Sequence, residues 1–257
     1  MRVPRRRARR GFSSAQLIVV SFLGVILLGA ALLRLPVAHA QGQSVGWLAA
    51  LFTATSAVCV TGLAVVDTGS AYSRFGQVVI LLLYQAGGLG ILTLGTLLAL
   101  VTRRRLGVGA RLQVQAQLNA LEVGRVLRLV RRIVLFVLVC ELLGALVLYP
   151  SFARLEGARE GAFFAVFHSV SAFNNAGFGL YPDSLVRFVG DPLVTLGVAA
   201  LVLAGGLGFL VAFELLARRR VPRRALSLHS KLVLFSSFVL LTSGTVALLA
   251  LEWAKPA

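Results

Sequence analysis

Long stretches without a single charged residue interrupt this amino-acid sequence, and they limit its possible folds more than any other feature. A helix that crosses a bilayer needs about 20 mostly apolar residues, because the hydrocarbon core is about 30 Å thick. Uncharged runs of that length are residues 11–33, 35–66, 75–102, 192–213 and 232–251. Apolar residues make up 58% of the chain, whereas about 45–50% is usual in soluble domains. We therefore predict an all-α integral membrane protein in contact with the lipid bilayer.

Arginine and lysine gather in three clusters, at residues 2–10, 103–132 and 218–231, which hold 20 of the 26 basic residues. Basic residues concentrate on the cytoplasmic side of membrane proteins, so the clusters and the N-terminus should lie in the cytoplasm. The apolar run after the first cluster is longer than the roughly 7–15 residues of a signal-peptide core, and we predict a retained transmembrane helix. Because membrane helices adjoin the arginines, the net charge of +17 indicates contact with the membrane surface and no nucleic-acid partner.

The position of the charges decides how the apolar runs cross the membrane. If residues 46–66 and 75–102 both crossed after the first helix, the arginines at 103–105 would lie outside. We therefore predict that residues 46–66 enter and leave on the outer side, and that residues 161–181 do the same. Irregular backbone at membrane depth survives only where protein buries it or where it lines a watery path. Two re-entrant loops thus predict a pore or an ion site.

The two loops repeat one pattern along the chain. Residues 51–67 read LFTATSAVCVTGLAVVD, and residues 166–183 read VFHSVSAFNNAGFGLYPD. Four identities share an offset of 115 residues: Phe52 with Phe167, Ser56 with Ser171, Ala57 with Ala172, and Gly62 with Gly177. The helix after each loop carries Gly-Gly-Leu-Gly, at residues 87–90 and 205–208. We predict a duplicated helix–loop–helix unit, a plan known among transporters and channels, with close helix packing or a hinge at these glycines.

Main-chain oxygens are the chemical groups that these loops offer. A short helix in each unit, at about residues 46–57 and 161–172, would bring the negative partial charge of its C-terminal carbonyls to the membrane centre, where it favours a cation. A potassium filter replaces the water around the ion with backbone carbonyls, and glycine permits the backbone angles that this needs. Gly62 and Gly177 stand where that glycine is expected. We therefore predict that dehydrated K⁺ binds backbone carbonyls of both loops.

Other polar residues lie near the loops. Asp67 and Asp183 follow them, and we expect these carboxylates at the outer mouth, where they raise the local cation concentration, or in ordinary solvated turns. Glu141 alone interrupts the apolar stretch 133–149. An acid inside a membrane is a candidate functional residue, and structural hydrogen bonding is the alternative. For His168 we expect a packing or capping role.

The sequence indicates that the protein is not an enzyme, because it offers no nucleophile–base pair and no metal-ligand spacing. Cys59 and Cys140 lie in apolar stretches, where we expect two buried small side chains. Residues 106–130 alternate apolar and polar positions with helical spacing. This pattern predicts an amphipathic helix on the cytoplasmic surface, in contact with lipid or with a cytoplasmic partner.

Several segments resemble the Trk/Ktr family of potassium-uptake channels: TSAVCVTGLAVVDT, FGQ, GGLGILT, FHSVSAFNNAGF and LHSKLVL. The resemblance covers residues 11–252 and implies a multi-pass subunit of the bacterial inner membrane that passes K⁺, in some members with Na⁺ or proton dependence. It also implies a homodimer and a cytoplasmic ring of nucleotide-binding regulatory subunits. The selectivity-filter positions that it implies are Val60, Thr61, Gly62, Asn175, Ala176 and Gly177.

Members of that family carry four helix–pore loop–helix repeats around one filter, whereas this sequence holds two repeats and the first helix of a third. We expect the following division: a basic cytoplasmic N-terminus at 1–10, the first repeat at 11–105, the linker at 106–130, the second repeat at 131–220, and the first helix of a truncated third repeat at 221–257. The expectation that follows is the N-terminal half of a truncated or split gene product. A single copy would not close a fourfold ring.

Two other functions are open at this point. A secondary transporter with broken helices would bind an organic substrate at the membrane midplane. It needs polar side chains in the breaks, and residues 58–62 offer few. A non-conducting scaffold or fragment would give no potassium uptake in a strain without its own uptake systems.

Overall fold

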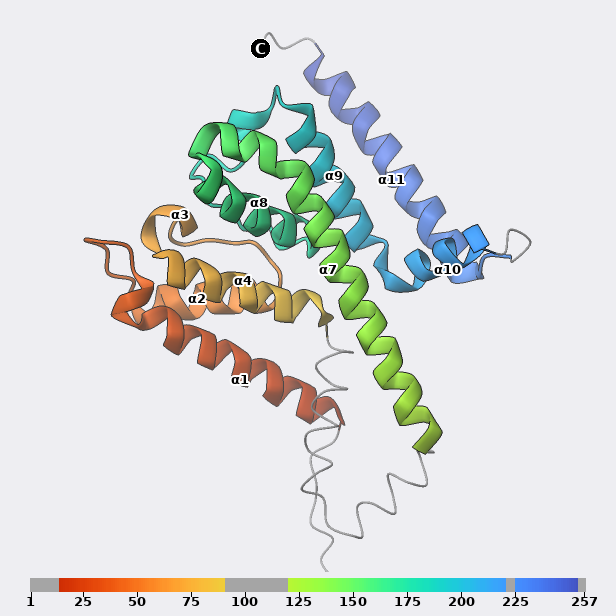
Figure 1. Cartoon of the computed structure of the whole chain (residues 1–257), viewed down its shortest axis with the longest axis horizontal. Coiled ribbons are helices and arrows are strands. Elements are labelled where there is room, and N and C mark those ends of the chain that lie inside the picture. Colours follow the sequence, from red (N-terminus) through yellow and green to blue (C-terminus); the bar gives the residue numbers. More distant parts are fainter. Residues whose placement is uncertain (1–13, 91–119, 221–224, 254–257) are drawn as a thin grey trace, which may run out of the picture.

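The computed structural model describes residues 14–90, 120–220 and 225–253, in which helices joined by irregular loops are the regular elements (Figure 1). The first unit consists of α1 (Ser14–Arg34), η1 (Pro36–Ala38), α2 (Trp47–Val58), α3 (Thr68–Ala71) and α4 (Arg74–Gly88). The second unit consists of α7 (Ala120–Glu156), α8 (Ala158–Phe173), η2 (Val186–Phe188), α9 (Pro192–Gly206) and α10 (Gly208–Arg220), and α11 (Leu228–Glu252) follows it. The predicted all-α class is confirmed for the described residues.

Some of these helices are long and apolar enough to cross a membrane. The part of α7 from Val130 to Glu156 qualifies, as does the whole of α11. Helices α9 and α10 meet at a bend of 100°, and they give a third span if the bent pair is counted as one helix. The predicted spans at 11–33 and 75–102 extend beyond the described residues. The length and apolar character of these helices fit a multi-pass membrane protein.

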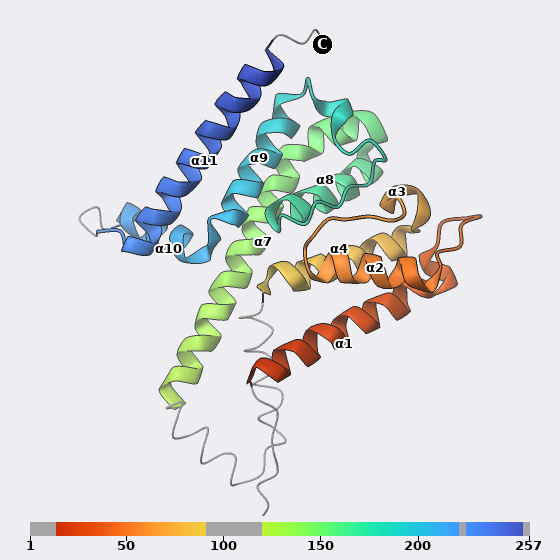
Figure 2. The same cartoon turned by 180° about the vertical axis from the view of Figure 1, so that it is seen from behind.

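Each short helix and the segment after it form a hairpin that leaves and returns at one end of its unit (Figures 1 and 2). In the first unit, the Ala40 N–H donates to the Ala71 carbonyl at 3.0 Å, so the chain before α2 lies beside the chain before α4. In the second unit, the Tyr181 hydroxyl donates to Glu156 Oε1 at 3.0 Å, which holds the end of the loop beside the start of α8. The fold therefore contains two hairpins. Their depth in a bilayer stays a prediction.

The Gly-Gly-Leu-Gly segments let α4 and α9 lie against the ends of the short helices. A Cβ atom on Gly87 would overlap the carbonyl oxygen of Val58, and one on Gly205 would overlap that of Phe173. The last glycine of each segment has a positive φ, 77° in the first and 78° in the second, a backbone conformation that glycine adopts readily. The predicted close packing is therefore confirmed at both segments, and in the second segment the helix axis also bends.

Tyr84 on α4 joins the two units. Its hydroxyl donates to the Phe167 carbonyl on α8 at 3.0 Å, and the ring is buried. The ring meets Phe167 edge-on, with centroids 5.6 Å apart, and stacks on Phe178 at 6.0 Å. At the other end of the same interface, Arg74 at the start of α4 forms an ion pair with Glu160 near the start of α8. The second loop is thereby packed into the core of the first unit.

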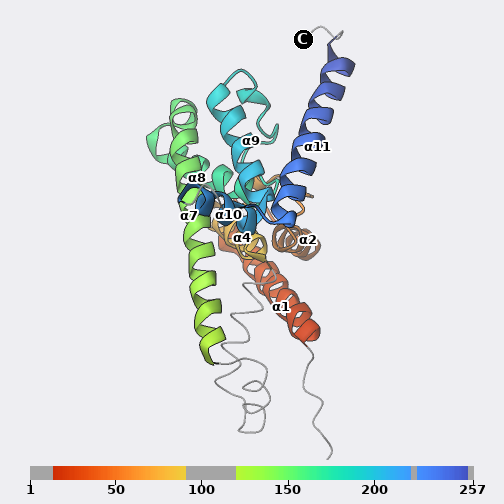
Figure 3. The same cartoon turned by 90° about the vertical axis from the view of Figure 1, so that its right-hand side faces the viewer.

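Helix α11 lies along the outside of the second unit (Figure 3). Among its described residues, Ser230 is the buried one. Large apolar side chains such as Leu240, which is 71% exposed, face away from the rest of the described chain. An apolar helix that is exposed on most sides is suited to lipid or to further protein rather than to water.

The division of the chain into units is tested at few points. Residues 1–10 and residues 106–119 of the predicted linker lie outside the described residues. Residues 120–130 open α7, which continues past the predicted boundary at 131 without a break. The predicted domain boundaries therefore stay predictions.

Gly205→Ala is expected to destabilise the fold, because the added Cβ would overlap the Phe173 carbonyl and force α9 away from α8. Overpacking of this kind costs about 1–3 kcal/mol, which lowers the thermal unfolding midpoint of the purified chain in detergent micelles. Gly24→Ala is the matched control, because nothing lies within 4 Å of the position of its Cβ and alanine favours a helix interior. Equal midpoints for the two variants would contradict the close contact.

Candidate functional site

Helix α2 ends in a turn that opens the first loop. The Val60 N–H donates to the Ala57 carbonyl at 3.1 Å, and the Thr61 N–H donates to the Ser56 carbonyl at 2.9 Å. Two bonds of this spacing define a Schellman motif, which places the residue after the helix cap in a left-handed conformation. Val60 has a φ of 56°, where a β-branched residue is rare and costs about 1–2 kcal/mol. The first loop therefore begins with a strained backbone.

Helix α8 ends in the same turn. The Asn175 N–H donates to the Ala172 carbonyl at 3.0 Å, and the Ala176 N–H donates to the Ser171 carbonyl at 2.8 Å. Asn175 has a φ of 57°, and asparagine adopts this conformation more readily than valine does. The backbone geometry of the two loops is thus the same while their side chains differ, as expected if main-chain groups are the functional ones.

Gly62 and Gly177 bring the two loops into contact. Their φ angles are 71° and 72°, in the region that favours glycine. A Cβ atom on Gly62 would lie 2.9 Å from the Cα of Gly177 and 2.6 Å from the carbonyl oxygen of Ala176. The structure therefore places the two predicted filter glycines side by side, with no room for a side chain on Gly62.

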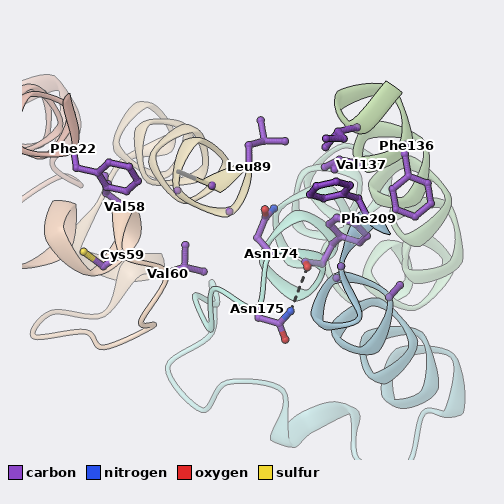
Figure 4. A pocket seen from close by; sticks show the side chains of 18 residues that line it. Phe22, Val58, Cys59, Val60, Leu89, Phe136, Val137, Asn174, Asn175 and Phe209 are labelled. Carbon is purple, nitrogen blue, oxygen red and sulfur yellow. Dashed lines mark hydrogen bonds between the residues drawn. The ribbon is translucent and has the colours of Figure 1, made fainter. Parts of the chain in front are cut away.

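A cavity of about 520 Å³ lies at the C-terminal ends of α2 and α8 (Figure 4). The residues that end α2, including Cys59 and Val60, line one side of it, and Asn174 and Asn175 line the other. The remaining walls are largely apolar: Phe22, Leu89, Ile133, Phe136, Val137 and Phe209. The C-termini of both short helices carry negative partial charge. In an apolar enclosure this charge favours a cation.

The other predicted filter residues differ in exposure. Thr61 is exposed, and its hydroxyl donates to Ser56 Oγ at 3.0 Å, so the side chain turns back onto α2. Ala176 is fully buried, whereas Gly177 is exposed. Gly177 and Asn175 line a second cavity of about 240 Å³ behind the loop. The six predicted positions are therefore gathered in two adjoining turns, but they do not all face one cavity.

The two predicted outer-mouth acids are both engaged in local contacts. Asp67 accepts the Ser70 N–H at 2.8 Å and caps α3. Asp183 forms an ion pair with Arg187 at 2.9 Å, and this hydrogen bond lowers the pKa of the Asp183 carboxyl. The carboxylate of Asp183 therefore stays ionised, but its charge is partly offset by Arg187. Attraction of cations by these acids stays a prediction.

Glu141, whose partners the sequence did not reveal, lies in a polar cluster with Gln85 and Asn174. Gln85 Nε2 donates to Glu141 Oε2 at 3.1 Å, and Asn174 Nδ2 donates to Glu141 Oε1 at 3.0 Å. Asn174 Nδ2 also lies 2.7 Å from Gln85 Oε1. We call these three side chains, from α4, α7 and α8, the amide–carboxylate cluster. Gln85 was missed by sequence reasoning, and its one signal was a polar residue inside an apolar helix.

The structure supports one of the remaining expectations and corrects another. His168 is buried, with Nδ1 2.8 Å from the Phe164 carbonyl, and Nε2 accepts the Leu180 N–H at 3.3 Å, so it packs and holds the loop as expected. We expected both cysteines to be buried. This is wrong for Cys59, which is exposed, and only partly right for Cys140, which is half-buried. Cys59 follows the last turn of α2 and so faces the cavity. The sequence predicted that the short helix ends before Cys59, but the apolar neighbours of Cys59 did not reveal that its side chain is exposed.

The groups that the described residues bring to the two turns are main-chain oxygens and side-chain amides. No three His, Cys, Asp or Glu side chains come together as a metal site in that part of the chain. The arrangement is suited to holding an ion that has lost its water, because carbonyl oxygens replace a hydration shell.

Comparison with known proteins gives a family and several relatives. The family model described as TrkH, cation transport protein, matches residues 5–255. The Ktr system potassium uptake protein B of Bacillus subtilis is 41% identical over 95% of this chain and 54% of that protein. The protein of the same name from Vibrio alginolyticus is 42% identical over 94% of this chain and 52% of that protein.

A third relative, the potassium/sodium uptake protein NtpJ of Enterococcus hirae, is 37% identical over 98% of this chain and 55% of that protein. The chain spans about half the length of the curated relatives it matches. The family consists of cation transporters and not of enzymes. Because the family model matches nearly the whole sequence, this chain belongs to the TrkH family of cation transport proteins.

Proposed function

We propose that this chain supplies two loops of a potassium pathway, in which dehydrated K⁺ binds backbone carbonyl oxygens of residues 60–62 and 175–177. The observation that carries this proposal is the contact of the loops at Gly62 and Gly177. It lies next to a cavity at which two helices end. The names of the Bacillus and Vibrio relatives specify the same ion.

The proposed binding of K⁺ follows from the backbone of the turns. An alkali ion enters a filter only if oxygen atoms replace its hydration shell. The left-handed residues in each turn, at 60 and 62 and again at 175 and 177, reverse the direction of successive peptide groups. Carbonyl oxygens of both loops can then point to one axis. The ends of α2 and α8 add negative partial charge on the cavity side.

We propose that further loops complete the ring. Large apolar side chains of α2 and of the first loop are open in this chain: Leu48 is 79% exposed and Leu63 is 63% exposed. Such surfaces are suited to contact with further protein in the membrane. The resemblance to the family adds the finer parts of the proposal: a homodimer, a cytoplasmic ring of nucleotide-binding subunits, and an inner-membrane location with a cytoplasmic N-terminus. Dependence on Na⁺ is supported by the name of the Enterococcus relative.

A non-conducting fragment is the second candidate function. One observation fits it: α11 exposes large apolar side chains on most sides, a surface suited to contact with further protein. A secondary transporter for an organic substrate has less support, because the turns offer main-chain oxygens and few polar side chains.

Uptake of K⁺ is expected only when further loops are present. The chain is produced in a bacterial strain without its own potassium uptake systems, alone and together with the part of the Bacillus relative that it does not match. Growth at low K⁺ and uptake of rubidium as a tracer are measured. Uptake by the pair supports the proposal, uptake by the chain alone contradicts the need for further loops, and no uptake in either arm supports the non-conducting fragment.

Gly62→Ser is expected to lower the discrimination of K⁺ over Na⁺ in the conducting form. A side chain at this position would meet the Ala176 carbonyl at 2.6 Å, and φ of 71° is strained for serine. A loss of about 1.4 kcal/mol of discrimination corresponds to a factor of about ten in the uptake ratio.

Gly46→Ser is the matched control for this substitution. It adds the same side chain at the N-cap of α2, where nothing lies within 4 Å of the Cβ and serine is a preferred residue. If both variants keep the wild-type uptake ratio, the filter assignment is wrong.

A further inference from the structure

We propose that Glu141 is a positioning residue that holds the second loop, and only that loop, against helix α4 of the first unit. The inference rests on the proposed function of the loop, because it concerns how the filter backbone is held in place. It assigns a role to the amide–carboxylate cluster, which lies outside the residues that would bind the ion.

Glu141 is bound to its neighbours through both its side chain and its main chain. Glu141 as a whole residue is only 5% exposed. Its side chain accepts hydrogen bonds from Gln85 on α4 and from Asn174 at the end of α8. The Glu141 carbonyl accepts the Ser169 hydroxyl at 2.6 Å, one turn earlier on α8. One residue of α7 therefore fixes two points of the short helix and one point of the first unit.

Asn174 transmits this contact to the loop. It is the cap residue of α8 and directly precedes Asn175, which has the left-handed backbone that starts the filter turn. Its Nδ2 also lies 2.8 Å from the Val170 carbonyl, so the side chain folds back onto the helix. Displacement of Asn174 would rotate the next peptide group and so move the carbonyl oxygens of the loop.

Gly88 shows that α4 is shaped to receive this side chain. A Cβ atom on Gly88 would overlap Asn174 Oδ1. Only glycine at this point lets the helix of the first unit approach the amide so closely. The contact between units is thus formed both by the hydrogen bond from Gln85 to Glu141 and by the absence of a side chain at Gly88, three residues further along α4.

Within the described parts of the chain, the first loop has no equivalent of the amide–carboxylate cluster. At the offset of 115 residues, the position of Asn174 corresponds to Cys59 and that of Glu141 to Ile26. At the offset of the glycine segments, Gln85 corresponds to Leu203. None of these side chains is an amide or a carboxylate, and Cys59 is exposed to the cavity. Two loops with the same backbone turn are therefore held in different ways.

A buried hydrogen-bond acceptor that loses its donors is costly, and the Glu141 carboxyl is buried with Gln85 and Asn174 as its donors. The cluster should therefore make the second loop stiffer than the first. We expect the amides of Asn175 and Ala176 to exchange with solvent hydrogen more slowly than the matched amides of Val60 and Thr61, although both pairs make the same backbone bonds.

The test combines hydrogen exchange with substitutions in the whole chain, purified in lipid nanodiscs. Glu141→Ala is expected to speed exchange at Asn175 and Ala176 by about tenfold and to leave Val60 and Thr61 unchanged. Asn174→Ala removes only the side-chain amide next to the loop and should have the same effect. It replaces the first variant in the test if Glu141→Ala does not fold. Glu252→Gln, an acid at the exposed end of α11, is the control.

Exchanging the two partners separates positioning from general stability. In the double variant Glu141→Gln, Gln85→Glu the carboxylate sits on α4 instead of α7, and both amides can still donate to it. Slow exchange of the second loop should return in this double variant. In the conducting form, Glu141→Ala is expected to lower the discrimination of K⁺ over Na⁺, and the double variant is expected to restore it. Faster exchange in both loops, or unchanged exchange in Glu141→Ala, would overturn the inference.

Failure of the proposed function gives a different result. If the wild-type chain gives no uptake with the further loops supplied, the potassium pathway is wrong, and the exchange rates still decide whether Glu141 holds the loop. If uptake is present but Glu141→Ala changes the exchange rates of both loops alike, the potassium pathway is supported and the positioning role of Glu141 is wrong.

Discussion

Two stretches of backbone meet at Gly62 and Gly177 without a side chain between them, and much of the described fold serves this contact. Each stretch must leave a helix, turn through left-handed residues and lie beside the other. Unpaired peptide groups are costly in hydrocarbon. The turns keep their first amides bonded to the helices from which they come.

Close approach of helices is what makes this arrangement compact. The glycine pairs of α4 and α9 let those helices lie against the carbonyl ends of α2 and α8. Tyr84 then fixes one unit on the other through the Phe167 carbonyl. Small residues at the contacts and one aromatic residue between the units thus set how far apart the two loops lie.

Sequence patterns predicted the parts of this structure that repeat or that follow from hydropathy. The uncharged runs predicted helices, the arginine clusters predicted hairpins at the loops, and a constant offset matched Gly62 with Gly177. Sequence did not predict that these glycines touch, because the angle between units depends on packing at Tyr84. It also did not predict that Gln85 meets Glu141, since the two lie on different helices, or that Cys59 is exposed where α2 ends.

The differences between the loops matter because their backbones are the same. Val60 holds a left-handed conformation that valine tolerates poorly, whereas Asn175 holds it with less strain. Among the described residues, the strained turn at Val60 has no such cluster beside it, whereas Asn175 is directly preceded by Asn174, whose side chain contacts Gln85 on α4 and Glu141 on α7. The backbone strain at Val60 and the hydrogen bonds of the amide–carboxylate cluster therefore act in the same direction. Both favour a second loop that keeps its conformation and a first loop that changes conformation at a lower free-energy cost. In a ring of oxygen atoms, the stiffer segment would define the cavity for the ion and the softer one would adjust to it.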